Sequence, residues 1–222
     1  MSYAYIIHLA NYSDGVLYIL AALLLIALAV IIDRAWSLRS AIVRGNSIIR
    51  ATTGHESLGQ QDLVDLRLRA GNLPEVALLA TAERYLHAVS AEAMANRLDE
   101  SIMLIAPTVD RRLWVLDTVV TLAPLLGLFG TIIGMFHAFS VLAQPGHAPA
   151  DITAGVADAL VATAFGIFIA VLGLTAYNAL TNQVRLIMHQ LDSMKMLIIN
   201  RTDAHAPAAA GAALRSPAMA NV

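Results

Sequence analysis

Three long apolar stretches, separated by polar segments, set the pattern of the chain. They cover residues 15–32, 118–142 and 152–180. At the rise of an α-helix, each stretch is long enough to cross a hydrocarbon core about 30 Å thick. The pattern therefore predicts an all-α membrane protein with three transmembrane helices, the second of which is expected to begin at residue 113.

The polar segment between the first and second spans, residues 33–112, predicts long helical extensions outside the membrane. Apolar positions recur at helical spacing over residues 37–49, and again in a stripe from Glu75 to Ile105 that falls on one side of a helix. Gly54 and Gly59 lie between these two stretches and predict a break between helices.

Two further features refine the helical extensions. The sequence Gly71-Asn72-Leu73-Pro74 predicts a turn, with Pro74 at the first position of the next helix. Pro107 predicts either a bend or a second helix start ahead of the second span. The segment 181–222 ends in a stretch rich in Ala and Pro, which is expected to be disordered after about residue 203.

Positive charge is distributed unevenly among the segments outside the spans. All 14 Lys and Arg residues lie either between the first two spans or after the third, and none lies in residues 1–14 or 143–151. The positive-inside rule then predicts that these two segments without Lys or Arg face the outside, and that 33–112 and 181–222 lie in the cytoplasm. Three crossings satisfy this arrangement.

Composition agrees with a membrane protein that has modest soluble parts. Hydrophobic residues make up 58% of the chain and charged residues only 14%, compared with roughly 25% charged residues in soluble domains. The net charge of −2 gives no indication of nucleic-acid binding, and the lack of cysteine excludes disulfides and thiolate metal sites. No cofactor is predicted. The first span reads as a retained signal-anchor, because no positive charge precedes it and Asp33-Arg34 follows it.

Small residues recur along one face of the second and third spans. Spacing of three and four residues lets two helix backbones approach closely in lipid, where packing drives association. Tight packing within one bundle is a sufficient explanation for the glycines. The positions predicted to pack helices together are Pro124, Gly127, Gly130, Gly134, Gly155 and Gly166.

Polar residues within the same two spans are candidates for a proton pathway. If the spans form an antiparallel hairpin about 143–151, residues whose numbers sum to about 294 lie at equal depth. Thr131 and Thr163 then share a layer in the middle of the membrane, and His137 and Asp158 share a layer nearer the outside. Structural alternatives are hydroxyls bonded to their own helix and polar side chains that reach the interface.

Two long motifs occur in these spans. They are TLAPLLGLFGTIIGMFHAF at Thr121–Phe139, and ITAGVADALVATA at Ile152–Ala164 with Ala176-Tyr177-Asn178. Both motifs, in this order and spacing, resemble those of the MotA/TolQ/ExbB proton-channel family. The predicted three-span topology is similar to ExbB and TolQ, whereas MotA has four spans. Where ExbB and TolQ usually carry Glu, this chain has Asp158.

The resemblance implies a multi-pass protein of the bacterial inner membrane, with a periplasmic N-terminus, that is not an enzyme. It implies a homopentamer around a dimer of an ExbD- or TolR-like single-span partner, in contact with membrane lipid and with a TonB- or TolA-like protein. Thr131 and Thr163 would line the pore. An ExbB-like role in TonB-dependent outer-membrane transport is favoured. The alternatives are a TolQ-like subunit of the Tol-Pal system and a non-conducting membrane scaffold.

Overall fold

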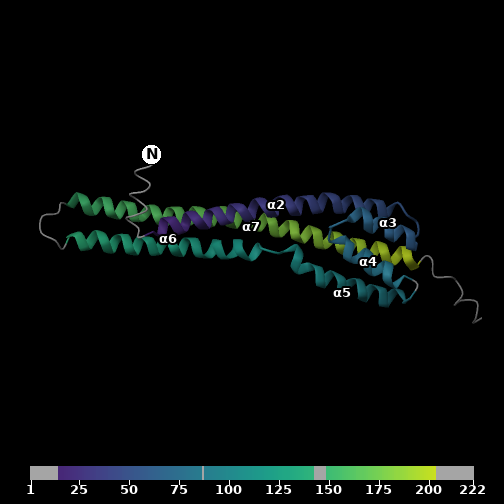
Figure 1. Cartoon of the computed structure of the whole chain (residues 1–222). Helices are drawn as coiled ribbons and strands as arrows, with labels where there is room; N and C mark the ends of the chain where they lie inside the picture. Colours follow the sequence, from purple (N-terminus) through teal and green to yellow (C-terminus); the bar gives the residue numbers. More distant parts are fainter. Residues whose placement is uncertain (1–14, 87, 143–148, 204–222) are drawn as a thin grey trace, which may run out of the picture. The chain divides into compact units, whose positions relative to one another are not determined.

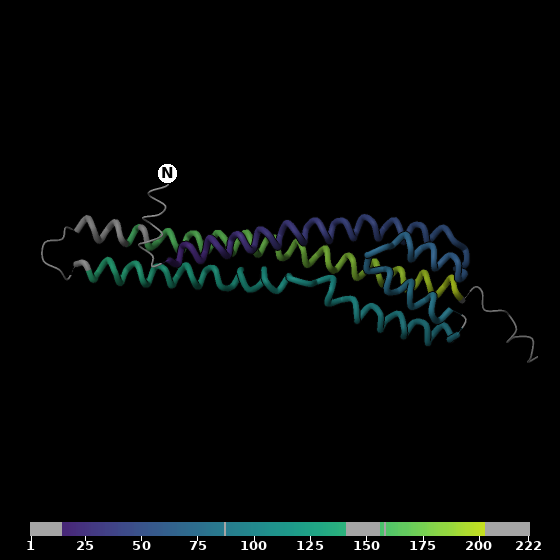
Figure 2. The backbone as a smooth tube through the Cα atoms, in the orientation of Figure 1, coloured from purple at the N-terminus to yellow at the C-terminus, as the bar shows by residue number. Residues whose placement is uncertain are grey.

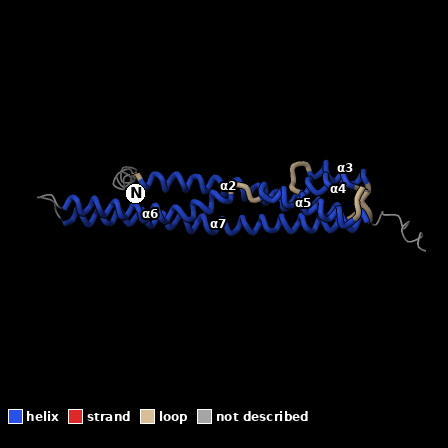
Figure 3. Tube along the Cα trace, turned by 90° about the horizontal axis from the view of Figure 1, so that it is seen from below, coloured by secondary structure: helices blue, strands red, loops and turns tan. Residues whose placement is uncertain are grey.

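The computed structural model describes residues 15–86, 88–142 and 149–203, and within these ranges the chain is helical with short connections (Figures 1 and 3). No strand occurs among the described residues. The helices are α2 (Val16–Thr53), α3 (Gln60–Ala70), α4 (Glu75–Tyr85), α5 (Ala91–Val109), α6 (Leu113–Leu142) and α7 (Pro149–Asp203).

Three of these helices, α2, α6 and α7, contain segments long and apolar enough to cross a membrane. The prediction of an all-α membrane protein with three spanning helices is therefore confirmed. The direction in which the helices cross stays a prediction, and the expected disorder after residue 203 lies outside the described residues.

The chain divides into two compact units. The membrane unit comprises Met1–Ser37 and Asp110–Asn182, and the extension unit comprises Leu38–Val109 and Gln183–Val222. Both α2 and α7 contribute one part to each unit, because neither helix is interrupted at the unit boundary.

In the membrane unit, α6 and α7 form an antiparallel hairpin (Figure 2). Their backbones approach each other closely at small residues. A Cβ atom added to Gly127 would lie 2.9 Å from the Ala162 carbonyl oxygen, and one added to Gly166 would lie 2.5 Å from the Ala123 carbonyl oxygen. The residues in contact at these glycines have numbers that sum to between 289 and 293, close to the predicted 294. Gly130 and Gly134 also lie at these contacts, so four of the predicted packing glycines occupy the helix interface.

The first helix joins the membrane unit through apolar packing and an ion pair. Val16 of α2 packs on Gly130 of α6, where an added Cβ would lie 3.2 Å from the Val16 Cγ1 atom. Near the other end of the spans, Arg112 Nη1 lies 2.9 Å from Asp33 Oδ2. Arg112 has a φ of 70°, a conformation that non-glycine residues rarely adopt, and α6 begins at the next residue.

The extension unit has its own apolar core and several polar ties between helices. α4 packs against both α3 and α5. Lys195 of α7 lies 2.7 Å from the Asp99 carboxylate of α5. Arg201 of α7 donates to the His55 carbonyl oxygen at 2.6 Å and to that of Thr53 at 3.2 Å, where α2 ends. The fully buried leucines and isoleucines of this core are Leu58, Leu63, Leu66, Leu78, Leu79, Leu98, Ile187, Leu191 and Ile198.

Helix breaks follow the turn residues in two places and differ from expectation in a third. The predicted breaks after Thr53 and after Ala70 are confirmed, and Gly71 has the positive φ of 59° that favours glycine. The prediction of a single helical stripe from Glu75 to Ile105 is wrong, because these residues are divided between α4 and α5. Ser90 starts the second helix: its hydroxyl oxygen accepts the Ala93 N–H at 3.3 Å, which is an N-cap contact.

Pro107 does not interrupt α5. It lies inside this helix, which continues to Val109. Of the two alternatives left open by the sequence, a second helix start is the one observed, at Leu113.

Replacing Gly166 by Ala is expected to destabilise the membrane unit. The new methyl group would overlap the Ala123 carbonyl, and overpacking of a close contact costs about 1–3 kcal/mol. The thermal unfolding midpoint of the purified full chain in detergent should therefore fall. The matched control is Ala164→Leu on the exposed side of α7, which should leave the midpoint nearly unchanged. Equal midpoints for Gly166→Ala and the unaltered chain would contradict the observed close approach.

Candidate functional site

The candidate polar layer lies at the interface of α6 and α7. The Thr163 hydroxyl donates to the Gly127 carbonyl oxygen at 2.9 Å and so bonds α7 to α6. In an α-helix the same carbonyl accepts the N–H four residues later, which here belongs to Thr131. One carbonyl therefore connects the side chain of Thr163 with the main chain of Thr131.

Thr131 is turned toward the interior of the membrane unit. Its side chain is only 7% exposed, and its hydroxyl donates to the Leu128 carbonyl oxygen of its own helix at 2.7 Å. The predicted alternative of bonding within the same helix is thus observed for Thr131, while Thr163 bonds across helices. Both hydroxyls use their hydrogen on a backbone carbonyl and keep lone pairs that can accept a hydrogen bond.

The second predicted layer is described only in part. His137 is half-buried on α6, with its ring centroid 6.0 Å from that of Phe136. Asp158 and Gly155 lie on α7, but the side chain of Asp158 and the surroundings of Gly155 are outside the described part of the structure. The proposed approach of His137 to Asp158 therefore stays a prediction. Pro124 lies within α6 and is half-buried.

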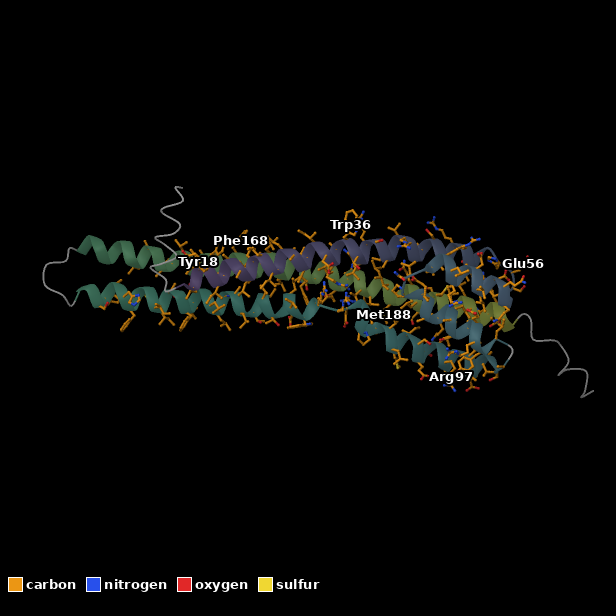
Figure 4. The ribbon with its side chains drawn as sticks, in the orientation of Figure 1. Tyr18, Trp36, Glu56, Arg97, Phe168 and Met188 are labelled. Carbon is orange, nitrogen blue, oxygen red and sulfur yellow. The ribbon has the colours of Figure 1, made fainter. Side chains whose placement is uncertain are left out.

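Large apolar side chains cover the outward faces of the spanning helices, while the glycines at the α6–α7 contact are buried. Phe168 of α7 and Trp36 of α2 point away from the helices, and Trp36 is 82% exposed (Figure 4). Such faces suit contact with lipid or with other apolar helices. The outward large apolar residues of α6 are Trp114, Leu122, Leu125, Leu128, Phe129, Ile132, Met135, Phe136 and Phe139.

Metal-binding chemistry finds no support in this part of the chain. Within residues 15–86, 88–142 and 149–203, no three His, Asp or Glu side chains are grouped so that they could hold a metal ion. The polar groups described at the α6–α7 interface are the hydroxyls of Thr131 and Thr163 and the backbone carbonyls that accept their hydrogen bonds.

Comparison with known proteins places the hairpin in a family. Residues 71–193, more than half of the chain, match the model of the MotA/TolQ/ExbB proton channel family. This region includes α4 to α6, most of α7, and both candidate threonines.

Individual relatives carry two different names. The chain is 34% identical over 104 residues to the biopolymer transport protein ExbB of Neisseria gonorrhoeae, which covers 46% of this chain and 47% of the relative. It is 41% identical over 81 residues to the Tol-Pal system protein TolQ of Haemophilus influenzae, covering 36% of each. A putative biopolymer transport protein, ExbB-like 3 of Synechocystis, is 24% identical over 180 residues and is covered over 85% of its length.

The matches to the ExbB and TolQ relatives span about half or less of the length of those proteins. The family model covers the spans in which the glycine contacts and the Thr163–Gly127 hydrogen bond occur. The chain belongs to the MotA/TolQ/ExbB proton channel family.

Proposed function

We propose that this chain is the channel subunit of an inner-membrane motor that uses the proton-motive force, and that the layer of Thr131 and Thr163 forms part of the proton pathway. The observation that carries the proposal is the Thr163 hydrogen bond to the Gly127 carbonyl. It fixes a hydroxyl within the membrane unit, beside the turn that contains Thr131. Family membership supplies the class of activity.

The two hydroxyls act in this proposal as fixed acceptors. Because each one donates to a carbonyl, its remaining lone pairs are oriented and can accept a proton-bearing group of a partner helix. The resemblance implies that this group is the intramembrane aspartate of an ExbD- or TolR-like partner. His137 and Asp158, nearer the outside, adjust proton access from the periplasm.

The proposed topology follows from the distribution of positive charge. The N-terminus and the 143–151 connector face the periplasm, and the extension unit lies in the cytoplasm. The family resemblance implies a ring of five copies around two partner helices. The exposed apolar faces of α6 and α7 offer surface for neighbouring copies as well as for lipid. A TonB- or TolA-like protein transmits the work across the periplasm.

The proposed system is ExbB-like and energises TonB-dependent transport across the outer membrane. Proteins named ExbB and TolQ both match this chain, so a TolQ-like role in the Tol-Pal system is the alternative within the family. The proposed role of Thr131 and Thr163 in the proton pathway is the same in both systems, so it does not depend on this choice.

A non-conducting scaffold is the alternative outside the family's activity. It is favoured by one observation: both hydroxyls are already bonded to backbone carbonyls, and glycine packing alone explains the hairpin. In a scaffold, Asp158→Asn would leave every process that depends on membrane potential unchanged.

The double variant Thr131→Val, Thr163→Val is expected to abolish transport energised by the proton-motive force. An interhelical hydrogen bond in a membrane contributes about 0.6 kcal/mol, so the variant should still fold and assemble. The measurement is uptake of a TonB-dependent substrate in cells whose own subunit is deleted, together with the amount of assembled complex.

Two controls separate chemistry from packing in this experiment. Thr131→Ser, Thr163→Ser keeps both hydroxyls and should retain transport. Thr175→Val removes a hydroxyl from the exposed side of α7, where it donates to the Val171 carbonyl oxygen at 2.8 Å, and should also retain transport. Normal uptake by the double valine variant would contradict the proposal that the two hydroxyls form part of the proton pathway.

The assembly itself is testable by mass. We expect the full chain, purified together with a single-span partner that carries an intramembrane aspartate, to form a complex of five copies with two partner chains. Native mass spectrometry in detergent gives the stoichiometry directly. A monomer or dimer that does not retain the partner would instead support the scaffold.

A further inference from the structure

A carboxyl group is buried in the extension unit, away from the threonine layer. Glu75 begins α4 directly after Pro74, and only 1% of its surface is exposed. Its carboxyl group occupies the space that a side chain of Gly45 on α2 would take: a Cβ added there would collide with Oε1 and lie 3.1 Å from Cδ. Gly45 is therefore required for Glu75 to fit between α4 and α2.

A second polar side chain reaches the same point from α7. Gln190 Oε1 lies 3.4 Å from the position of the added Cβ on Gly45, so it shares the niche with the Glu75 carboxyl group. The Gln190 amide nitrogen donates to the Ile42 carbonyl oxygen at 3.1 Å, which orients the amide oxygen. Glu75 Oε2 and Gln190 Oε1 are both buried without a hydrogen-bond donor among the described residues.

Two acceptor oxygens without a donor are costly in a buried niche, and an ionised carboxylate there costs more. One proton on Glu75 resolves both problems. It neutralises the carboxyl group and supplies the single O–H that Gln190 Oε1 lacks.

The charged groups around the niche do not compensate a carboxylate. Burial raises the pKa of Glu75, and a hydrogen bond from its own backbone opposes this rise only in part. Arg44 of α2 reaches toward the turn at Gly71, and most charges of the surrounding helices are paired with each other. These pairs are Arg67 with Glu83, Arg69 with Asp65, and Lys195 with Asp99, while Arg185, His189 and Asp192 of α7 are exposed.

We infer that Glu75, Gly45 and Gln190 form a proton-binding site at the junction of α2, α4 and α7, in which the neutral Glu75 carboxylic acid donates a hydrogen bond to Gln190 Oε1. The ligand is a single proton, and the site is separate from the polar layer of the membrane unit. Loss of the proton places a charge against an acceptor oxygen and loosens the three-helix junction.

The site makes the stability of the extension unit depend on pH. The pKa of Glu75 is raised in the folded chain above its ordinary value of 4.5. The contribution of Glu75 to the free energy of unfolding is therefore fully present below pH 4.5 and is lost as pH rises through the raised pKa. A higher pH on the side of the membrane where this unit lies would release the junction.

Infrared difference spectroscopy of the full chain in lipid nanodiscs tests the protonation state. Spectra are recorded over a pH series that begins below pH 4.5. At each pH, subtracting the spectrum of Glu75→Gln from that of the unaltered chain should leave the carbonyl band of one protonated carboxylic acid, and this band should persist above pH 4.5, the ordinary pKa of the group. The spectrum of the matched control Glu92→Gln, which alters an exposed residue of α5, should retain the band. Gln190→Leu keeps Glu75 in place and should move the band to higher frequency, because the hydrogen bond is lost.

Hydrogen exchange gives the structural consequence. Amide exchange in residues 42–48 and 187–193 should increase several-fold over the pH range in which the band disappears, relative to Glu75→Gln at the same pH. Loss of the carboxylic acid band at or below pH 4.5 would overturn the proposal. Protection that followed sodium or potassium concentration instead of pH would also overturn it, and would identify the oxygen pair as a cation site.

Discussion

The close approach of α6 and α7 is the constraint on which the membrane unit depends. In lipid there is no water to expel from between two helices, so their association rests on contact between backbones. The contacts at Gly127, Gly134 and Gly166 leave no room for a single methyl group. The same approach brings the Thr163 hydroxyl within reach of a carbonyl on the facing helix. Packing and polar chemistry therefore have one structural origin.

Much of the membrane unit follows from one-dimensional patterns. A span is defined by the length of an apolar stretch, and an antiparallel hairpin with a short connector has only one register at helical rise. The pairing of α6 positions with α7 positions was therefore accessible, to within a few residues, from residue numbers. The hydrogen-bond acceptor of each hydroxyl could not be predicted from the sequence. Bonding within a helix and bonding across helices differ only by small changes in side-chain rotamer and helix rotation.

The extension unit shows where such patterns lose information. The apolar residues from Glu75 to Ile105 keep the spacing of one helix although the chain leaves the helix between Tyr85 and Ala91. Their periodicity therefore predicted one continuous helix, whereas Ser90 caps the start of a second helix. Glu75 was missed for a related reason. A glutamate in the first turn of a helix is ordinarily an exposed residue that interacts with the helix dipole. Its burial arises only from the distant Gly45 and Gln190, which no local pattern connects.

Pro124 gives the two helices of the hairpin different mechanical properties. Proline has no N–H, so the Val120 carbonyl lacks its partner in the α6 ladder, and two turns later the Gly127 carbonyl is shared with Thr163. Two irregularities thus fall within eight residues of α6, whereas α7 contains no proline after its first residue. A bend within the hairpin is therefore expected in α6, between Val120 and Gly127, and not in α7.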